Sequence, residues 1–370
     1  MSKIKIPYVD LSYKGKSFKE LTLIFKKILK NGQFVGGEEV DLFEKNISNL
    51  CNTKYAVALN SGTDALTLAL HLLGVKKGDE VITPPNSFIA STATIIHLGA
   101  KPVFVDVLDD QNINPEKIQK AITKKTKVIM PVHLSGRMCK MDEINLIAKK
   151  NNIAVIEDAA QSIGSKYKNE MAGSFSDFGC FSAHPLKNLN ALGDAGYLTT
   201  NNYEYYKKIK SLSNHGMEKR NIIHNFGYVS RMDNLQAAFL NYKLKNLDKI
   251  ISIRRKNASI YIKYLDRNYV FFKEESEHEF NTYHTFVVQV KLRDKLKDYL
   301  LKKGVSTSIH YPVPIHLQPA SKYLGYKLGD FPITEKQSKK ILTLPINENL
   351  KSIQIKFICQ IINQFFRKYY

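Results

Sequence analysis

The sequence predicts an α/β fold in which helices flank a mostly parallel mixed sheet, followed by a smaller α+β domain at the C-terminus. The chain has 370 residues, which is enough for a large hydrophobic core and a second lobe. Between about residues 40 and 200, short apolar runs alternate with segments of helical periodicity. Such alternation is typical of parallel strands that are connected by helices.

Two segments in the first part of the chain have clear helical spacing. Apolar residues recur at intervals of three or four within 40–50 and within 66–73, and Gly74 is a plausible stop for the second helix. Short β-branched runs separate such segments. The expected strands lie near 55–58, 81–82, 102–105, 128–130 and 154–156.

The pattern changes from about residue 251. A long helical stretch rich in Arg and Lys precedes a strand-like run at 285–290, a proline-rich segment at 311–319 and an apolar C-terminal helix. We therefore expect a large domain at residues 1–250 and a small α+β domain at residues 251–370.

The formal net charge of +21 has two interpretations. A nucleic-acid-binding protein uses such charge against phosphates, whereas lysines can also be spread over exposed helix faces. The basic residues form many short clusters, and no helix-turn-helix or zinc-finger spacing is present. We expect no nucleic-acid partner, although a basic surface suits an anionic substrate.

Targeting and redox features are also informative. No run of about 18 consecutive apolar residues predicts a membrane span, and residues 1–7 lack a signal-type apolar segment. A cytoplasmic location without membrane attachment is expected. The four cysteines are far apart and form no C-x-x-C pair, which favours free buried thiols over disulfides or a metal site.

A first cluster of polar residues, NSGTDAL at 60–66, follows an expected strand and opens an expected helix. Backbone N–H groups, a hydroxyl and the helix dipole at such a Ser-Gly-Thr turn suit a phosphate. Ordinary helix capping by Ser61 or Thr63 is the alternative.

Two further clusters follow expected strands, where open α/β sheets bind ligands. In EDAAQ at 157–161, Asp158 ends an apolar run, although it could equally be a loop or capping aspartate. In FSAHPLKN at 181–188, Lys187 follows a strand-like run and a proline-restricted turn, although any surface lysine could stand there.

The order and spacing of these clusters resemble the DegT/DnrJ/EryC1/StrS family of sugar aminotransferases. This family has fold type I of the pyridoxal-phosphate-dependent transferases, the aspartate aminotransferase fold, so the large domain is expected to bind the cofactor. The resemblance covers nearly the whole chain. It rests on the segments 6–11, 32–36, 60–66, 78–83, 157–161, 181–196, 230–238 and 310–319.

The resemblance implies roles for three residues around pyridoxal 5'-phosphate. Lys187 is expected to form a Schiff base with the cofactor, Asp158 to pair with its pyridine nitrogen, and Gln161 to hydrogen-bond near its phenolic oxygen. These roles agree with the chemistry, because a carboxylate keeps the ring nitrogen protonated. A lysine that moves protons must be neutral once released, which requires a lowered pKa.

The resemblance also implies contacts to the rest of the cofactor and to the substrate. The remaining candidates are Gly62, Thr63 and Ser182 at the phosphate, Phe88 stacked on the ring, and His310 and His316 at the sugar. No metal is expected.

The sequence departs from the family pattern at two positions. Val229 stands where the family usually has an asparagine that reaches the partner subunit's cofactor phosphate, which puts that contact in doubt. Ala195 replaces a glycine of the usual Gly-Asp-Gly-Gly, which we interpret as a minor packing change.

The expected reaction transfers an amino group, with L-glutamate as the usual family donor, to a carbonyl sugar. The favoured substrate is a nucleotide-linked keto-sugar destined for a surface polysaccharide, and the enzyme is expected to be a homodimer with shared active sites. The sequence of residues 181–190, together with Val229, also resembles a branch of the family that aminates a free sugar acid, 8-oxo-3-deoxy-manno-octulosonate.

Two other functions are alternatives. A cofactor-dependent sugar dehydratase of the same family would carry histidine where Lys187 stands, so the lysine argues against it. A basic nucleic-acid-binding regulator would not need Asp158, Gln161 and Lys187 together.

Overall fold

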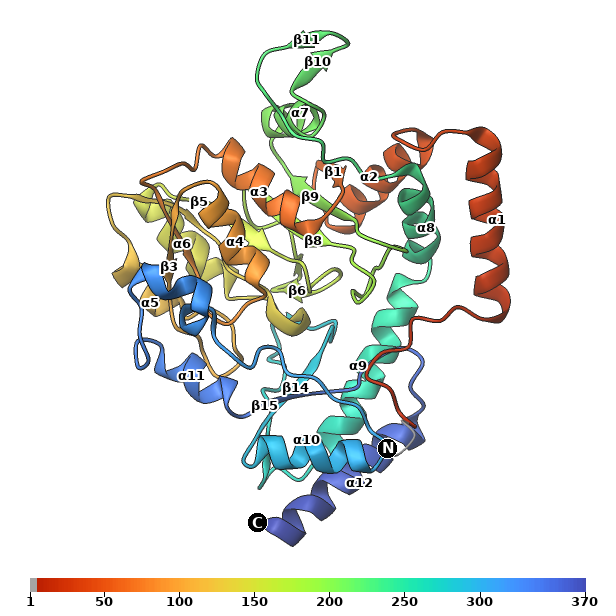
Figure 1. Ribbon diagram of the computed structural model, residues 1–370, viewed down its shortest axis with the longest axis vertical. Coiled ribbons are helices and arrows are strands. Elements are labelled where there is room, and N and C mark those ends of the chain that lie inside the picture. The colour runs from red at the N-terminus through yellow and green to blue at the C-terminus, as the bar shows by residue number, and fades with distance from the viewer. Residues whose placement is uncertain (1–4) are drawn as a thin grey trace.

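The computed structural model describes residues 5–370, and its main element is a seven-stranded sheet with the order β1-β9-β8-β5-β4-β2-β3 (Figure 1). Only β9 runs antiparallel to its neighbours, and the other neighbouring pairs are parallel. The predicted mostly parallel mixed sheet is confirmed. Its strands are β1 (Tyr55–Leu59), β2 (Glu80–Thr83), β3 (Lys101–Phe104), β4 (Thr126–Ile129), β5 (Ala154–Asp158), β8 (Phe178–Ser182) and β9 (Gly196–Thr200).

Helices pack against both faces of this sheet. The helices of the described residues, including those of the C-terminal part, are α1 (Gly15–Asn31), α2 (Glu38–Leu50), α3 (Gly62–Leu72), α4 (Ile89–His97), α5 (Pro115–Ala121), α6 (Met141–Asn151), α7 (Tyr203–Leu212), α8 (Asn234–Leu244), α9 (Leu247–Tyr264), α10 (Arg293–Lys302), α11 (Pro332–Ser338) and α12 (Ser352–Tyr369). Short 3-10 turns are η1 (Leu134–Gly136), η2 (Ile315–Leu317) and η3 (Pro319–Leu324). None of the helices within residues 5–370 is long and apolar enough to cross a membrane.

The two faces of the sheet have separate hydrophobic clusters because alternate strand residues point to opposite sides. In β1, Ala56 and Ala58 belong to the cluster that contains residues of α2, α6 and α8. Val57 and Leu59 belong to the cluster that contains residues of α3, α4 and α7. The four cysteines are buried and free, as predicted.

The C-terminal part of the chain forms a second, smaller sheet. Strands β12 (Val270–Phe271), β14 (Phe286–Val290) and β15 (Ile341–Leu344) pair antiparallel. Their buried residues share one cluster with apolar residues of α9, α10 and α12. The remaining short strands are β6 (Lys166–Tyr167), β7 (Glu170–Met171), β10 (Met217–Lys219), β11 (Ile222–Ile223) and β13 (Glu279–Phe280).

The predicted boundary at residue 250 falls inside α9, which contributes to both parts. Ile251 packs into the large-sheet cluster, whereas Ala258 and Tyr261 pack into the C-terminal one. The N-terminal residue Ile6 also belongs to the C-terminal cluster and forms a bridge with Val305. We propose that the two domains divide within α9.

Candidate active site

The carboxyl ends of the parallel strands bring the predicted site residues to one edge of the large sheet. β5 ends at Asp158, β8 ends at Ser182, and β1 is followed by the turn that opens α3 at Gly62. Strands β1, β5 and β8 point the same way because β9, between β1 and β8, is antiparallel to both. This edge is where open α/β sheets bind ligands.

The turn before α3 lies directly on the ends of β8 and β9. A Cβ atom at Gly62 would lie 2.8 Å from the Cβ of Ser182 and 3.1 Å from the carbonyl oxygen of Phe181. A Cβ atom at Gly196, the first residue of β9, would lie 2.1 Å from the carbonyl carbon of Ser61. Both positions therefore require glycine, and the contact places the N-terminus of α3 beside Ser182.

The N-terminus of α3 has both features that its sequence suggested, a side-chain cap and free N–H groups. The Ser61 hydroxyl caps the helix by accepting a hydrogen bond from the N–H of Asp64 at 3.0 Å. The first N–H groups of a helix have no intrahelical acceptor, and among residues 5–370 those of Gly62 and Thr63 have no acceptor either. These two N–H groups and the positive end of the helix dipole lie at the same helix terminus, which is the arrangement of an anion-binding site.

Lys187 stands on a tight loop between β8 and β9. The N–H of Ala191 donates to the carbonyl of Ala183 at 2.8 Å and closes the neck of this loop. Inside it, the N–H of Lys187 donates to the carbonyl of His184 at 2.8 Å. Burial lowers the pKa of the Lys187 ammonium from 10.5 to about 8, and the negative charge of Asp158 opposes part of this change.

Asp158 is a buried carboxylate, 4% exposed, at the end of β5. The Ser91 hydroxyl donates to its Oδ2 at 2.7 Å, and the N–H of Ala160 donates to its Oδ1 at 3.2 Å. Burial raises the pKa of Asp158 above its ordinary value, while these two hydrogen bonds and the charge of Lys187 oppose the rise. A cationic partner at this carboxylate would therefore be stabilising.

Gln161 and Phe88 meet through a residue of the proline-rich segment. The Gln161 side chain accepts a hydrogen bond from the N–H of Ser135 at 2.8 Å, and its Nε2 donates to the Tyr311 hydroxyl at 3.5 Å. The Tyr311 ring lies 6.0 Å from the ring of Phe88, measured between centroids. Phe88 itself is 56% exposed, so its face is available for stacking.

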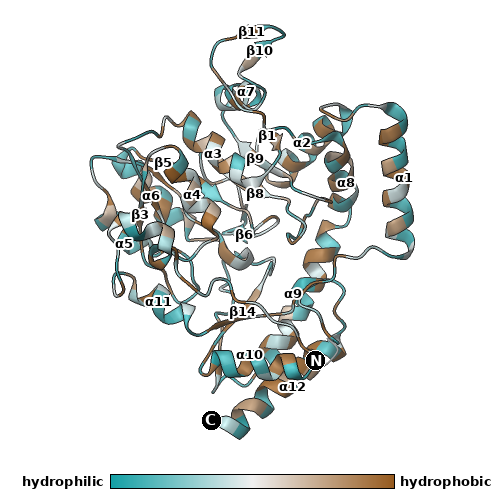
Figure 2. Cartoon of the chain, in the orientation of Figure 1, coloured by the Kyte–Doolittle hydropathy of each residue, from teal (hydrophilic) through white to brown (hydrophobic). Residues whose placement is uncertain are grey.

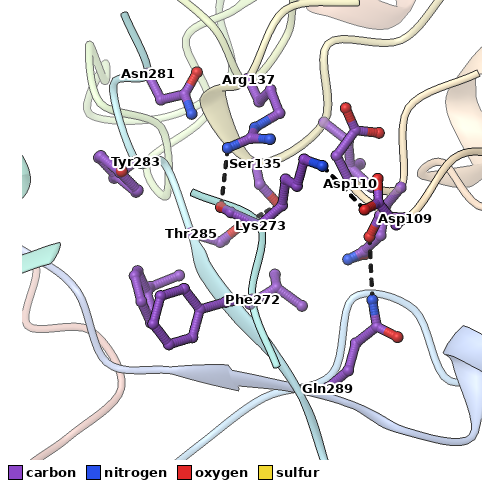
Figure 3. Close-up of a pocket in the computed structure, with 14 residues that line it drawn as sticks. Asp109, Asp110, Ser135, Arg137, Phe272, Lys273, Asn281, Tyr283, Thr285 and Gln289 are labelled. Atoms are coloured by element: carbon purple, nitrogen blue, oxygen red, sulfur yellow. Dashed lines mark hydrogen bonds and ion pairs between the residues drawn. The ribbon is translucent and has the colours of Figure 1, made fainter. Parts of the chain in front are cut away.

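A cavity beside η1 lies between loops of the large sheet and residues of the C-terminal part of the chain (Figure 3). Arg137 Nη2 donates to the carbonyl of Lys273 at 2.9 Å, and the Lys273 ammonium lies 3.1 Å from Asp109. The Thr285 hydroxyl donates to Ser135 Oγ at 2.7 Å. Because the N–H of Ser135 also donates to Gln161, these contacts connect the C-terminal part of the chain to the candidate site.

Four histidines of this region differ in their surroundings. His133 is fully buried: its Nδ1 accepts from the N–H of Cys139 at 3.1 Å, and its Nε2 then donates to Glu157 at 3.0 Å. This is a structural contact. His184 is exposed at the start of the lysine loop.

The two histidines expected at the sugar are placed differently from each other. His310 Nδ1 bonds Thr343 Oγ1 at 2.9 Å, and burial and the charge of Lys187 lower its pKa to about 4. His316 is 2% exposed, with Nε2 bonded to Glu335 at 3.1 Å and its ring packed on Phe331. A substrate contact by His316 would require this packing to open, and it stays a prediction.

Sequence reasoning did not assign roles to three residues of this region. Ser91 lies just beyond the segment that contains Phe88, and Tyr311 directly follows His310. His284 has a buried Nδ1 without a hydrogen-bond partner in the described chain, and burial, followed by the charges of Lys187 and Arg254, lowers its pKa. No pattern marked His284, because it and Lys187 are far apart in the sequence.

Comparisons with known proteins agree with this geometry. The profile of the DegT/DnrJ/EryC1/StrS aminotransferase family matches residues 17–363. A transaminase from Aneurinibacillus thermoaerophilus, named for dTDP-3-amino-3,6-dideoxy-alpha-D-galactopyranose, is 38% identical and covers 97% of this chain and 99% of its own. A "pleiotropic regulatory protein" from Geobacillus stearothermophilus is 37% identical over 99% of this chain and 100% of its own.

The structural likeness is equally complete. The crystal structure of S. venezuelae DesV in complex with a ketimine intermediate has a TM-score of 0.95 and 33% sequence identity, and the match covers 97% of this chain and 98% of DesV. The expected fold type I class is confirmed by this match. With the profile match across almost its whole length, the chain belongs to the DegT/DnrJ/EryC1/StrS aminotransferase family.

Proposed function

We propose that this enzyme moves the amino group of L-glutamate to the carbonyl carbon of a nucleotide-linked keto-sugar for a surface polysaccharide. Its family makes the chain a sugar aminotransferase whose cofactor is pyridoxal 5'-phosphate. The observation that carries the proposal is the buried Asp158 carboxylate electrostatically coupled to Lys187, whose pKa is lowered, at the sheet edge that also holds the phosphate-type turn at Gly62.

The residues present fit this cofactor. Asp158 is a buried carboxylate whose hydrogen-bond donors, Ser91 and Ala160, are both neutral, so a protonated ring nitrogen would supply the charged donor that these two groups do not. Because Gly62 packs closely against Ser182, the free N–H groups of Gly62 and Thr63 and the hydroxyl of Ser182 lie together at the N-terminus of α3. We propose that these groups, with the Thr63 side chain, hold the phosphate.

When bound, pyridoxal phosphate supplies an electron sink for the negative charge on the carbon next to the amine. We propose that Lys187 Nζ would hold the cofactor and, once released as a free amine, would carry the proton from the amine-bearing carbon to the cofactor carbon on the other side of the nitrogen. A neutral amine is needed for this task, and burial supplies it by lowering the pKa of Lys187 to about 8.

The other proposed roles orient the ring. Asp158 holds a proton on the ring nitrogen, and Ser91 fixes the direction of that carboxylate. Gln161, with its oxygen engaged by Ser135, presents Nε2 as a donor towards the ring's phenolic oxygen. Phe88 covers one face of the ring and excludes water from it.

The sugar is tested by a single-turnover assay, and its outcome is our first prediction. Enzyme charged with pyridoxamine phosphate is mixed with dTDP- or UDP-linked keto-sugars, or with free 8-oxo-3-deoxy-manno-octulosonate. The visible band of lysine-bound cofactor is expected to return with a nucleotide-linked sugar, since a dTDP-sugar transaminase is 38% identical to this chain. A return with the free sugar acid alone would contradict the proposal and favour the rival substrate.

The substrate proposal is also consistent with the charge of the chain. The formal net charge of +21 favours encounter with an anionic substrate, and both a pyrophosphate and a sugar carboxylate are anionic. Charge therefore does not separate the two substrates. The assay separates them because each is offered by itself.

Exposed apolar surface supports the proposal of a homodimer with shared active sites. The hairpin of β10 and β11 stands out from the body of the molecule beyond α7, and α1 lies along its side with hydrophobic positions among hydrophilic ones (Figures 1 and 2). Exposed apolar side chains of this kind mark interaction surfaces. They include Phe18, Leu23, Phe25 and Leu29 on α1 and Ile222, Ile223, Phe226 and Val229 at the hairpin.

Our second prediction is that sedimentation velocity gives the mass of a dimer at working concentrations. Phe226 is 97% exposed, so Phe226→Asp is expected to weaken the dimer and the activity together. Leu146→Asp, at a position 70% exposed on α6, is the matched control and should change neither. A fully active wild-type monomer would show that the sites are not shared.

A further inference from the structure

A buried lysine, Lys243 of α8, contacts the loop that carries Lys187. Lys243 is 7% exposed, and its Nζ donates to Asn190 Oδ1 at 2.5 Å and to the hydroxyl oxygen of Tyr13. The Tyr13 ring also faces this ammonium, with its centroid 4.7 Å from Nζ. Asn190 Nδ2 in turn donates to the carbonyl oxygen of Pro185 at 2.6 Å. A chain of hydrogen bonds thus runs from α8 to the turn before Lys187.

The chemistry of Lys243 and Asn190 determines the direction of these hydrogen bonds. A lysine ammonium has donors and no acceptor, so Asn190 must present its oxygen to Lys243. The amide nitrogen of Asn190 is thereby turned towards Pro185, whose carbonyl accepts it. Without Lys243 the amide would keep only its bond to Pro185, and the side of Asn190 that faces α8 would lose its anchor.

The rest of the loop is attached elsewhere. Ala191 bonds Ala183 across its neck, and Lys187 bonds His184 within it. Asn188 Nδ2 donates to the carbonyl of Thr282 at 3.1 Å, which attaches one side of the loop to the segment before β14. Lys243 and Asn190 hold the side that faces α8.

We propose that Lys243 is a positioning residue for Lys187: through Asn190 it holds the turn at 185–190 in the conformation from which Lys187 Nζ reaches the cofactor and the substrate carbon. The inference rests on the proposed role of Lys187. It assigns no contact with the cofactor or the substrate to Lys243 itself. Small displacements of a reacting group slow catalysis strongly, so such support matters to the rate.

The energetics of Lys243 distinguish positioning from simple stabilisation. Burial lowers the pKa of Lys243 from 10.5 to about 8, which means that the protein environment disfavours its charge, although Glu348 opposes the change. A methionine of similar length would avoid this cost of desolvation. Lys243→Met is therefore expected to retain or raise the melting temperature while it impairs Lys187.

The first measurement uses the cofactor-free protein and does not depend on activity. Acetylation of Lys187 by limiting acetic anhydride is followed by mass spectrometry as a function of pH, with the exposed Lys245 as the internal reference. The midpoint for Lys187 is expected near 8 in the wild-type protein. It should move towards 10.5, the ordinary value, in Lys243→Met, because a loosened turn exposes the amine to water.

The second measurement is the single-turnover rate of the loaded enzyme. Lys243→Met is expected to slow the reaction by about 10- to 100-fold, and Lys243→Arg, which keeps donors, should recover part of the loss. Asn190→Ala should give a similar defect, and adding Lys243→Met to it should cost little more, because both act through one chain. Lys245→Met, at an exposed position just after α8, is the control.

The outcomes separate this inference from the proposed function. If Lys243→Met matches Lys245→Met in both the labelling midpoint and the rate, the inference is wrong even though the wild-type enzyme transaminates. If the wild-type enzyme neither binds the cofactor at Lys187 nor transaminates, the proposed function is wrong. Should Lys243→Met not fold, Asn190→Ala carries the same test, and a wild-type midpoint and rate in that variant would overturn the inference.

Discussion

Lys187→Ala is expected to lower transamination by at least about 10⁴-fold and to abolish the visible band of lysine-bound cofactor. The reason is that one atom, Lys187 Nζ, is proposed both to attach the cofactor and to carry the proton between two carbons. The side chain is half-buried on the loop between β8 and β9, so its removal should leave the circular-dichroism spectrum unchanged. Stopped-flow absorbance with L-glutamate measures both effects.

The same prediction has a pH dependence with a defined sign. Because burial lowers the pKa of Lys187 to about 8, the folded protein holds a larger fraction of neutral amine than an exposed lysine would. At pH 7 about one-tenth of Lys187 is then neutral, against about one part in 3,000 at a pKa of 10.5. The rate at which cofactor-free protein captures pyridoxal phosphate should therefore rise with pH through about 8 and level off above it.

The control for Lys187 is an exposed lysine. Lys245→Ala, just after α8, should transaminate and bind the cofactor like the wild-type enzyme. If Lys187→Ala kept the wild-type rate, Lys187 would not be the residue that holds the cofactor. A capture rate that rose only near pH 10 would show instead that the amine is not shielded from water.

The large sheet and its helices were predictable because their sequence pattern is local. The apolar positions in 40–50 and 66–73 predicted two helices, which correspond to α2 and α3 in the structure. Gly74, the predicted stop, lies just beyond α3 with a positive φ of 75°. The strand-like runs became β1 to β5, each within two residues of the expected position. Strand order was not predictable, because β9 enters the sheet between β1 and β8 by contacts far apart in sequence.

The site was predictable to the extent that it follows strand ends. Asp158 and Ser182 end β5 and β8, so parallel strands place them together without any further information. Ser91 and Lys243 were not found because each acts on a residue distant in the chain, Asp158 in one case and Asn190 in the other. A serine or lysine within a helix carries no mark of such a partner.

Asp158→Asn is expected to slow the chemical step by about 10²- to 10³-fold or more. An uncharged amide cannot keep a proton on the ring nitrogen, so the electron sink is weakened. Asparagine keeps the size of the side chain, and Asp158 already pays a desolvation penalty that raises its pKa, so the neutral variant should fold. Single-turnover rates at saturating L-glutamate isolate this step from binding.

A substitution of Ser91 tests the same role of Asp158 with a smaller expected effect. Its hydroxyl donates to Asp158 Oδ2 at 2.7 Å, and hydrogen bonds to charged groups contribute about 1.5–3 kcal/mol. Ser91→Ala should therefore slow the same step by about 10- to 100-fold, less than Asp158→Asn, and the double variant should be no slower than Asp158→Asn because Ser91 acts through that carboxylate. Asp298→Asn, on the exposed face of α10, should leave the rate unchanged. An Asp158→Asn enzyme with the wild-type single-turnover rate would mean that this carboxylate does not serve the ring nitrogen.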